Sequence, residues 1–135
     1  MTAPVVDCSA TAAWVLADED STYADLALDV VVEHGALAPA LWWAEMRNVL
    51  LKSERHGRIN PADTESALAS LAELRIRLDH APRGPEVLRL ARAYSLTAYD
   101  AIYLELAVRE GRSLATLDRK LARAAAAEGV ETIGS

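Results

Sequence analysis

The chain has 135 residues, the size of one domain, and its 14 basic and 20 acidic side chains give a formal net charge of −6. Hydrophobic residues make up 52% and charged residues 25%, so the chain can bury a core and is not disordered. The acidic balance excludes a protein that coats nucleic acid through bulk charge. It allows an enzyme that binds divalent cations and contacts a phosphate backbone locally.

The cysteine content and the hydropathy of the chain exclude further classes of protein. Cys8 is the single cysteine, which excludes an intrachain disulfide and a cysteine-based zinc site. Met1 is not followed by a basic stretch and an apolar run, and no run of about 18 apolar residues is present. We therefore expect no signal peptide, no membrane span and a cytoplasmic location.

Short apolar runs alternate with helix-prone segments along the whole chain. In chain order we predict a strand at 4–8, helices at 9–16 and 22–34, a strand at 36–38, helices at 39–57 and 60–74, a strand at 75–79, helices at 84–91 and 97–111, a strand at 113–116, a helix at 118–128 and a strand at 130–133. Capping signals support several of these boundaries. They are Thr22-x-x-Asp25, Pro39, Asn60-Pro61 and Thr97-x-x-Asp100 at helix starts, and Gly35 after a helix end.

This order of elements predicts an α/β protein. Short strands separated by helices imply a central, mainly parallel sheet of about four to five strands with helices on both faces. The sequence has no linker, internal repeat or low-complexity tail. We therefore expect a single domain over residues 1–135.

Two aspartates follow predicted strands. Asp7 lies at the carboxyl end of the first strand, and Asp118 follows the strand that ends at Thr116. Ligands of parallel α/β sheets bind at the carboxyl ends of the strands, so both side chains are candidates for a site. Each can equally be an ordinary helix cap, because aspartate is a favoured N-cap residue.

Glu45 lies inside an amphipathic helix. Trp42 and Val49 are three and four residues away and so share its side of the helix. A glutamate beside this much apolar surface is half-buried, and buried glutamates are rare unless they are paired or bind a metal. An ion pair with Lys52 or an arginine is the alternative. Asn48, one turn away, can position a carboxylate or a water on a metal.

The capping box Thr97-x-x-Asp100 explains Asp100 as a feature of a helix start, but the same side chain can also face a site. The four acids, at strand ends, in a helix and at a helix start, can converge on one pocket. Several carboxylates in one pocket repel each other and need a cation. Oxygen ligands select Mg²⁺ or Mn²⁺ over zinc.

The motifs around these acids resemble a known family. They are Val6-Asp7-Cys8-Ser9, Glu45-x-x-Asn48, Tyr99-Asp100-Ala101-x-Tyr103-x-x-x-Ala107 and Ala115-Thr116-Leu117-Asp118. In this order, and over essentially the whole chain, they are similar to the PIN-domain endoribonucleases, specifically the VapC type of bacterial toxin. The last two motifs, with their aspartates 18 residues apart, are the most specific part of the resemblance.

The resemblance implies a PIN-like fold and a Mg²⁺- or Mn²⁺-dependent endoribonuclease, the toxin of a toxin–antitoxin pair, in which an ion activates water against RNA phosphodiester bonds. It further implies a homodimer and a small antitoxin that blocks the site. The implied catalytic acids are Asp7, Glu45, Asp100 and Asp118, supported by Ser9, Asn48 and Thr116. Asp7 and Asp100 would bind the metal directly, with Glu45 and Asp118 acting through water.

Other classes fit the residues less well. Haloacid dehalogenase-type phosphatases need a second aspartate at the position of Ser9, and receiver domains need a late lysine at a strand end, whereas Lys120 lies past a helix start. The main alternative is a catalytically inactive PIN-fold module that binds RNA or protein. Metal-dependent cleavage by the purified protein separates the two.

Basic, aromatic and imidazole side chains give weaker indications. Arginines of the middle third can border a substrate groove, although arginines spread over helices are usually solvated. They are Arg55, Arg58, Arg75, Arg77, Arg83, Arg89 and Arg92. The tryptophans Trp14, Trp42 and Trp43 could stack on bases, but their helical settings favour packing in the core or against a partner. The histidines His34, His56 and His80 are predicted to lie at helix ends or loops, away from the acids.

Overall fold

The computed structural model describes residues 2–16 and 21–133. The elements in chain order are β1 (Val5–Val6), α1 (Cys8–Val15), α2 (Thr22–His34), β2 (Ala36–Pro39), α3 (Leu41–Arg55), α4 (Pro61–Glu73), β3 (Ile76–Asp79), α5 (Gly84–Tyr94), α6 (Ala98–Glu110), β4 (Leu114–Ala115) and α7 (Arg119–Ala127). This order confirms the predicted α/β class.

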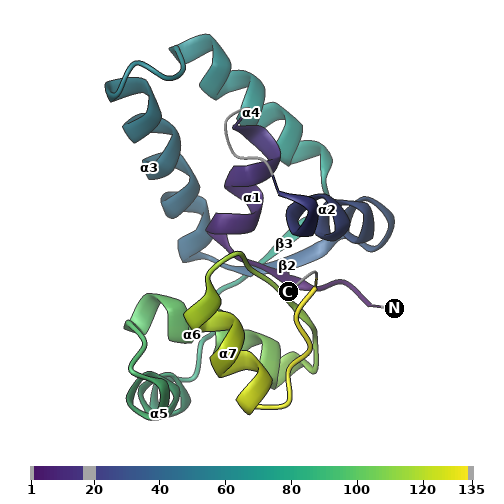
Figure 1. Ribbon diagram of the computed structural model, residues 1–135, viewed down its shortest axis with the longest axis vertical. Coiled ribbons are helices and arrows are strands. Elements are labelled where there is room, and N and C mark those ends of the chain that lie inside the picture. Colours follow the sequence, from purple (N-terminus) through teal and green to yellow (C-terminus); the bar gives the residue numbers. More distant parts are fainter. Residues whose placement is uncertain (1, 17–20, 134–135) are drawn as a thin grey trace.

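The four strands form one parallel sheet in the order β3-β2-β1-β4. Val5 pairs with Leu37 on one side and Leu114 on the other, so β1 lies in the interior of the sheet. Helices α1, α3 and α4 lie on one side of the sheet, and α5, α6 and α7 lie on the other (Figure 1). The predicted parallel sheet with helices on both faces is therefore confirmed.

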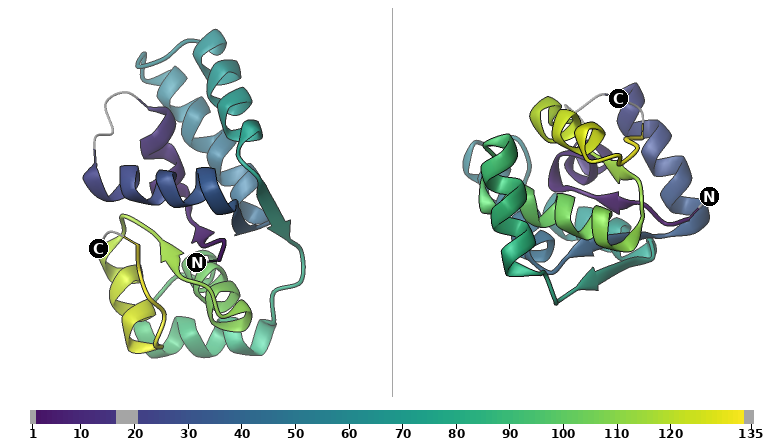
Figure 2. Two further views of the ribbon diagram at one scale, coloured as in Figure 1. Left: turned by 90° about the vertical axis from the view of Figure 1, so that its right-hand side faces the viewer. Right: turned by 90° about the horizontal axis from the view of Figure 1, so that it is seen from below.

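The apolar residues that flank the sheet form one continuous core. Val5 and Val6 are fully buried, as expected for a central strand covered on both faces. Helix α6 packs across β1 and β2 and buries Tyr103, Leu104 and Leu106. The two further views show helices surrounding the sheet, with α2 and α7 along one edge of the molecule (Figure 2). This packing holds the ends of the short strands in fixed positions.

Gly35, between α2 and β2, is a position at which only glycine fits. Its φ is +75°, and a Cβ built there would lie 2.8 Å from the carbonyl oxygen of Arg75. Both the positive φ and the close approach of the β3 backbone exclude a side chain. The predicted break after His34 is therefore confirmed, and the glycine also lets β2 pair closely with β3.

Several predicted boundaries were wrong by a few residues. Ser21 caps α2 in place of Thr22, because its Oγ accepts the N–H of Ala24 at 3.2 Å. Pro39 ends β2 and does not open α3; the following N–H, of Ala40, donates to the carbonyl of Asp79 and continues the strand pairing. A proline lacks only its own N–H, so it is tolerated at the end of a strand as well as in a first helical turn.

The predicted strand at 130–133 was also wrong. Only Thr132 forms an isolated parallel bridge, with Leu114. Cys8, predicted to end the first strand, instead begins α1, because the side chain of Asp7 caps that helix. Within residues 2–16 and 21–133, no helix is long and apolar enough to cross a membrane.

Candidate active site

Asp7 leaves β1 at the carboxyl edge of the sheet and is buried, with 6% of its surface exposed. Its Oδ1 accepts the N–H of Ala10 at 3.0 Å, so the capping interpretation is correct. The same oxygen accepts the hydroxyl of Ser9 at 2.7 Å, and Oδ2 accepts the hydroxyl of Thr116. A carboxylate with this many donors is fixed in one orientation, which an N-cap alone does not require.

Ser9 and Thr116 connect β1 to the segment after β4. The N–H of Leu117 donates to Ser9 Oγ at 2.9 Å, and the N–H of Asp118 donates to Thr116 Oγ1 at 3.0 Å. The two hydroxyls are 3.4 Å apart. The supporting residues predicted at these two positions therefore do lie against Asp7, and they also position the backbone that carries Asp118.

Asp118 is exposed and caps α7. Its Oδ1 accepts the N–H groups of Lys120 and Leu121 at 2.9 and 3.1 Å, so the capping interpretation is correct here too. The second carboxylate oxygen has no such role in the described part of the chain. Capping fixes the side chain beside Asp7 and leaves an oxygen for a ligand.

Glu45 lies half-buried on α3. The alternative interpretation, an ion pair with Lys52 or an arginine, is absent from the described residues; instead the hydroxyl of Tyr103 donates to Glu45 Oε1. Burial raises the pKa of Glu45, the Tyr103 hydrogen bond lowers it, and the charges of Asp100 and Asp7 raise it.

Asp100 lies in the first turn of α6, where its N–H donates to Thr97 Oγ1 at 3.1 Å. Burial raises the pKa of Asp100 and the charge of Asp118 raises it further, while Thr97 and the cation of Lys120 lower it. Burial likewise raises the pKa of Asp7, against the hydrogen bonds from Thr116, Ser9 and Ala10, and the charge of Asp118 adds to the rise.

The charge effects on these pKa values link the four carboxylates in a closed set. Asp118 acts on Asp7 and on Asp100, and Asp100 and Asp7 both act on Glu45. We call this set, Asp7, Asp118, Asp100 and Glu45, the acidic ring. The sequence separates them by up to 111 positions, so the fold alone brings them together. Three of the four have raised pKa values, because their charges are buried and repel each other. The ring therefore favours a species that supplies positive charge.

A divalent ion fits this donor set. The ring offers only carboxylate oxygens, the ligands of Mg²⁺ and Mn²⁺. Among the residues that the structure describes, no three Asp, Glu, His or Cys side chains are close enough together to hold one ion directly. Mg²⁺ commonly uses one or two carboxylates and keeps several waters. The predicted set of two direct ligands and two acting through water is compatible with this spacing.

Asn48 was predicted to support the site, but the structure places its side chain in solvent and not in the acidic ring. It is exposed on α3 one turn beyond Glu45, and within residues 2–16 and 21–133 no hydrogen bond joins its amide to the ring. The helical spacing of three residues places it on the same side as Glu45, but its side chain lies in solvent.

Sequence reasoning missed two supporting residues. Tyr103 is a buried residue of α6, yet its hydroxyl donates to Glu45. Thr11 donates to the carbonyl of Asp7 at 3.1 Å and accepts the indole N–H of Trp42 at 2.9 Å, which ties α1 to α3 beneath the site. Tyr103 lies three residues after Asp100 on the same face of the helix, and this spacing could have indicated its role. No local feature of the sequence indicated the role of Thr11.

Cys8 and the histidines stay outside the chemistry. Burial, together with the charges of Glu45 and Asp7, raises the pKa of the Cys8 thiol to about 12, so it is not a nucleophile at neutral pH. As predicted, the histidines lie away from the ring: His34 ends α2, His56 caps the end of α3 and His80 follows β3.

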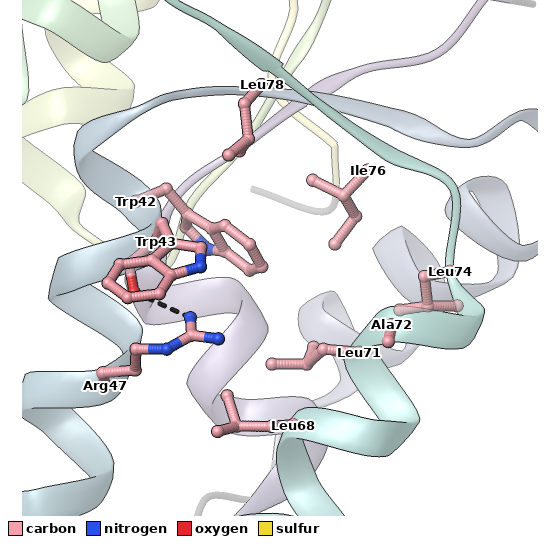
Figure 3. Close-up of a pocket in the computed structure, with 9 residues that line it drawn as sticks. All are labelled: Trp42, Trp43, Arg47, Leu68, Leu71, Ala72, Leu74, Ile76 and Leu78. Carbon is pink, nitrogen blue, oxygen red and sulfur yellow. Dashed lines mark hydrogen bonds between the residues drawn. The ribbon is translucent and has the colours of Figure 1, made fainter.

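The tryptophans confirm the packing interpretation in two of three cases. Trp42 is buried, and the indole N–H of Trp14 donates to the carbonyl of Ala24 at 2.7 Å. Trp43 is 52% exposed, with the guanidinium of Arg47 lying 3.7 Å from its ring centroid. It borders an apolar groove of about 230 Å³ between α3, α4 and β3 (Figure 3). This groove is separate from the acidic ring.

A parallel sheet with an acidic ring at its carboxyl edge defines a class, and comparison with known proteins identifies it. The sequence model of the PIN domain family matches residues 5–127, so the chain belongs to the PIN domain family. It is similar to Ribonuclease VapC3 of Pyrobaculum aerophilum, with 35% identity over 121 residues, 87% of this chain and 91% of the relative. A solved relative is PAE2754 from Pyrobaculum aerophilum, at a TM-score of 0.70 and 29% identity, covering 91% of this chain and 84% of that chain.

Proposed function

We propose that this protein is a metal-dependent endoribonuclease and the toxin of a toxin–antitoxin pair. The acidic ring carries the proposal, because four carboxylates converge there with three raised pKa values and no arginine among them. The similarity to a protein named as a VapC ribonuclease supports RNA as the substrate. The cytoplasm remains the predicted location.

Asp7 and Asp100 would hold Mg²⁺ or Mn²⁺ directly, and Glu45 and Asp118 would act through water. The ion, when bound, would lower the pKa of a water and stabilise charge on the phosphoryl oxygens. Ser9 and Thr116 orient Asp7, and Tyr103 orients Glu45. Glu45, whose pKa is raised by burial and whose side chain Tyr103 holds, would accept the proton of the attacking water as general base.

The test is cleavage of total RNA by protein that has been stripped of metal and then given Mn²⁺ or Mg²⁺. We expect cleavage with either ion and none with excess chelator. Asp7→Asn should abolish it, and the matched control Asp79→Asn, in a carboxylate paired with Arg109, should retain it. Equal cleavage by wild type and Asp7→Asn would reveal a contaminating ribonuclease, and no cleavage with either ion would favour the inactive binding module.

We further propose a small antitoxin and a homodimer as partners. Trp43 and Leu51 are 52% and 43% exposed on α3, an apolar surface that the helix does not bury itself. Trp42 and Leu50, their neighbours in the sequence, are buried in the core and do not contribute to that surface. Sedimentation velocity should show a dimer at high concentration; a strict monomer would overturn the homodimer.

A further inference from the structure

A second cavity lies directly beside the acidic ring. Its volume is about 480 Å³, within the range of about 300–1,000 Å³ of small-molecule sites. The residues that line it are Ser21, Tyr23, Thr116, Leu117, Asp118, Arg119 and Ala122. They come from the start of α2 and from the β4–α7 connection with the first turns of α7, elements that lie along the same edge of the molecule (Figure 2).

The cavity and the ring share two residues. Thr116 binds Asp7 and Asp118 belongs to the ring, yet both also line the cavity. A phosphodiester placed at the ring therefore has one of its two flanking nucleotides beside this cavity. The position of the cavity is what a substrate subsite requires.

Tyr23 gives the cavity an aromatic surface that the fold does not use. It is 53% exposed, whereas α2 packs through Ala24, Ala27 and Val31. Leu117 and Ala122 supply partly buried apolar atoms in the same cavity. A flat ring beside small apolar groups is the surface on which nucleic-acid bases stack, and stacking tolerates any base because every base has a π-face.

Arg119 adds a cation at the same place. It is exposed at the first position of α7, and no carboxylate in the described part of the chain is paired with it. A guanidinium matches the geometry of a phosphate with two parallel hydrogen bonds. An aromatic ring and a free guanidinium in one cavity are complementary to a base and its phosphate.

We propose that this cavity binds the nucleotide next to the scissile phosphate, with its unpaired base stacked on Tyr23 and its phosphate held by Arg119. The inference rests on the proposed function, since RNA is the ligand.

The experiment measures binding of a short, fluorescently labelled single-stranded RNA of mixed sequence by fluorescence anisotropy. Asp7→Asn in Mg²⁺ serves as the non-cleaving background. Adding Tyr23→Ala should weaken the Kd about tenfold or more, the usual effect of losing one stacked base. Tyr23→Phe should restore it, because the ring and not the hydroxyl is required. Val32→Ala, an exposed substitution at the far end of α2, is the control and should change nothing.

Arg119 has its own readout. Arg119→Gln should weaken binding and lower the slope of log K against log salt by about one phosphate contact. Arg123→Gln, one turn further along α7 and outside the cavity lining, should leave the slope unchanged. A purely structural arginine would not alter a salt dependence.

The outcomes separate the two proposals. Unchanged Kd in Tyr23→Ala and unchanged slope in Arg119→Gln overturn the subsite, even if wild type cleaves RNA. Tyr23-dependent RNA binding without any metal-dependent cleavage by wild type supports the subsite and overturns the nuclease. No RNA binding by any variant, together with no metal-dependent cleavage by wild type, overturns both. Intact RNA binding with loss of antitoxin binding in Tyr23→Ala would make the cavity a protein-docking site and overturn the subsite.

Discussion

Two groups of acidic side chains each include a residue at the end of a strand and a residue of helix α6, and they differ in what balances their charge. In the first, Arg109 contacts Asp79 and Glu105, each at 2.7 Å. Its hydrogen bonds and charge lower the pKa of Asp79. In the acidic ring the carboxylates act on one another through their charges, and burial raises the pKa of Asp7, Glu45 and Asp100. A built-in cation makes the first group structural, whereas the ring depends on an exchangeable one.

Removing the built-in cation should have the largest effect. Arg109→Met leaves Glu105, which is 2% exposed, buried without its partner, so the free energy of unfolding should fall by about 3–5 kcal/mol. Urea denaturation measures this change. Arg92→Met, on the exposed side of α5, should shift it by less than about 0.5 kcal/mol. Equal stability of Arg109→Met and wild type would show that the acids of this group need no cation.

Supplying the exchangeable cation should stabilise the ring. Mn²⁺ at about a hundred times its Kd should raise the free energy of unfolding of wild type by about 2.7 kcal/mol, because the ion binds the folded state. Asp7→Asn should lose most of this gain and Asp79→Asn should keep it. The measurement is the Tm with and without the ion. A gain of the same size in all three proteins would place the ion elsewhere.

The pH dependence of the metal-free protein should have opposite signs in the two groups. Because the pKa of Asp7 is raised, its carboxyl stabilises the folded state in full below the unfolded pKa near 3.8, and this stabilisation is lost as pH rises. Because the pKa of Asp79 is lowered, its carboxylate stabilises the folded state above that value. At pH 7, Asp7→Asn should therefore be as stable as wild type or more stable, and Asp79→Asn less stable, by about 1 kcal/mol. The Asp7 difference should shrink as pH falls from 7 toward 4, whereas the Asp79 difference should persist to about pH 4 and shrink only as pH falls further, toward about 3. Chemical denaturation across this range checks the signs, and a destabilised Asp7→Asn at pH 7 would leave only its capping role.

The smallest change probes the orientation of the ring. Tyr103→Phe removes a hydrogen bond that lowers the pKa of Glu45, so this pKa should rise further. The acidic limb of the pH–rate profile should move to higher pH, with kcat at neutral pH lower by a few-fold. Tyr99→Phe, at the exposed neighbouring tyrosine, is the matched control. An unshifted profile would remove Glu45 from the proton transfer.

Local signals in the sequence were enough for the order of the elements as far as the last helix, and for the places of three acids at strand ends and helix starts. Asp7, Asp100 and Asp118 lie where a strand ends or a helix begins, positions that hydrophobic patterning and capping rules locate well. The last strand failed because Val130 and Thr132 alternate as a strand does, but only Thr132 reaches a partner, and pairing is a tertiary property.

Contacts between distant elements could not be predicted. The bond from Tyr103 to Glu45 spans 58 positions, and the hydrophobic pattern gave that tyrosine only a core role. Asn48 failed for the opposite reason: its spacing from Glu45 is right, but the rotation of α3 leaves it in solvent. Tyr23 could not be singled out, since nothing in the sequence around it shows that α7 lies beside it.

The hydrogen bond between Thr116 and Asp7 joins positions that are 109 residues apart. During synthesis the ribosome adds Asp7, Glu45 and Asp100 before it adds Thr116 and Asp118. A growing chain thus lacks the hydroxyl that holds Asp7 and one wall of the proposed nucleotide subsite. Under the proposed function, the order of translation protects the message that is being read from its own product, and it gives an antitoxin made alongside time to be present when the last helix folds.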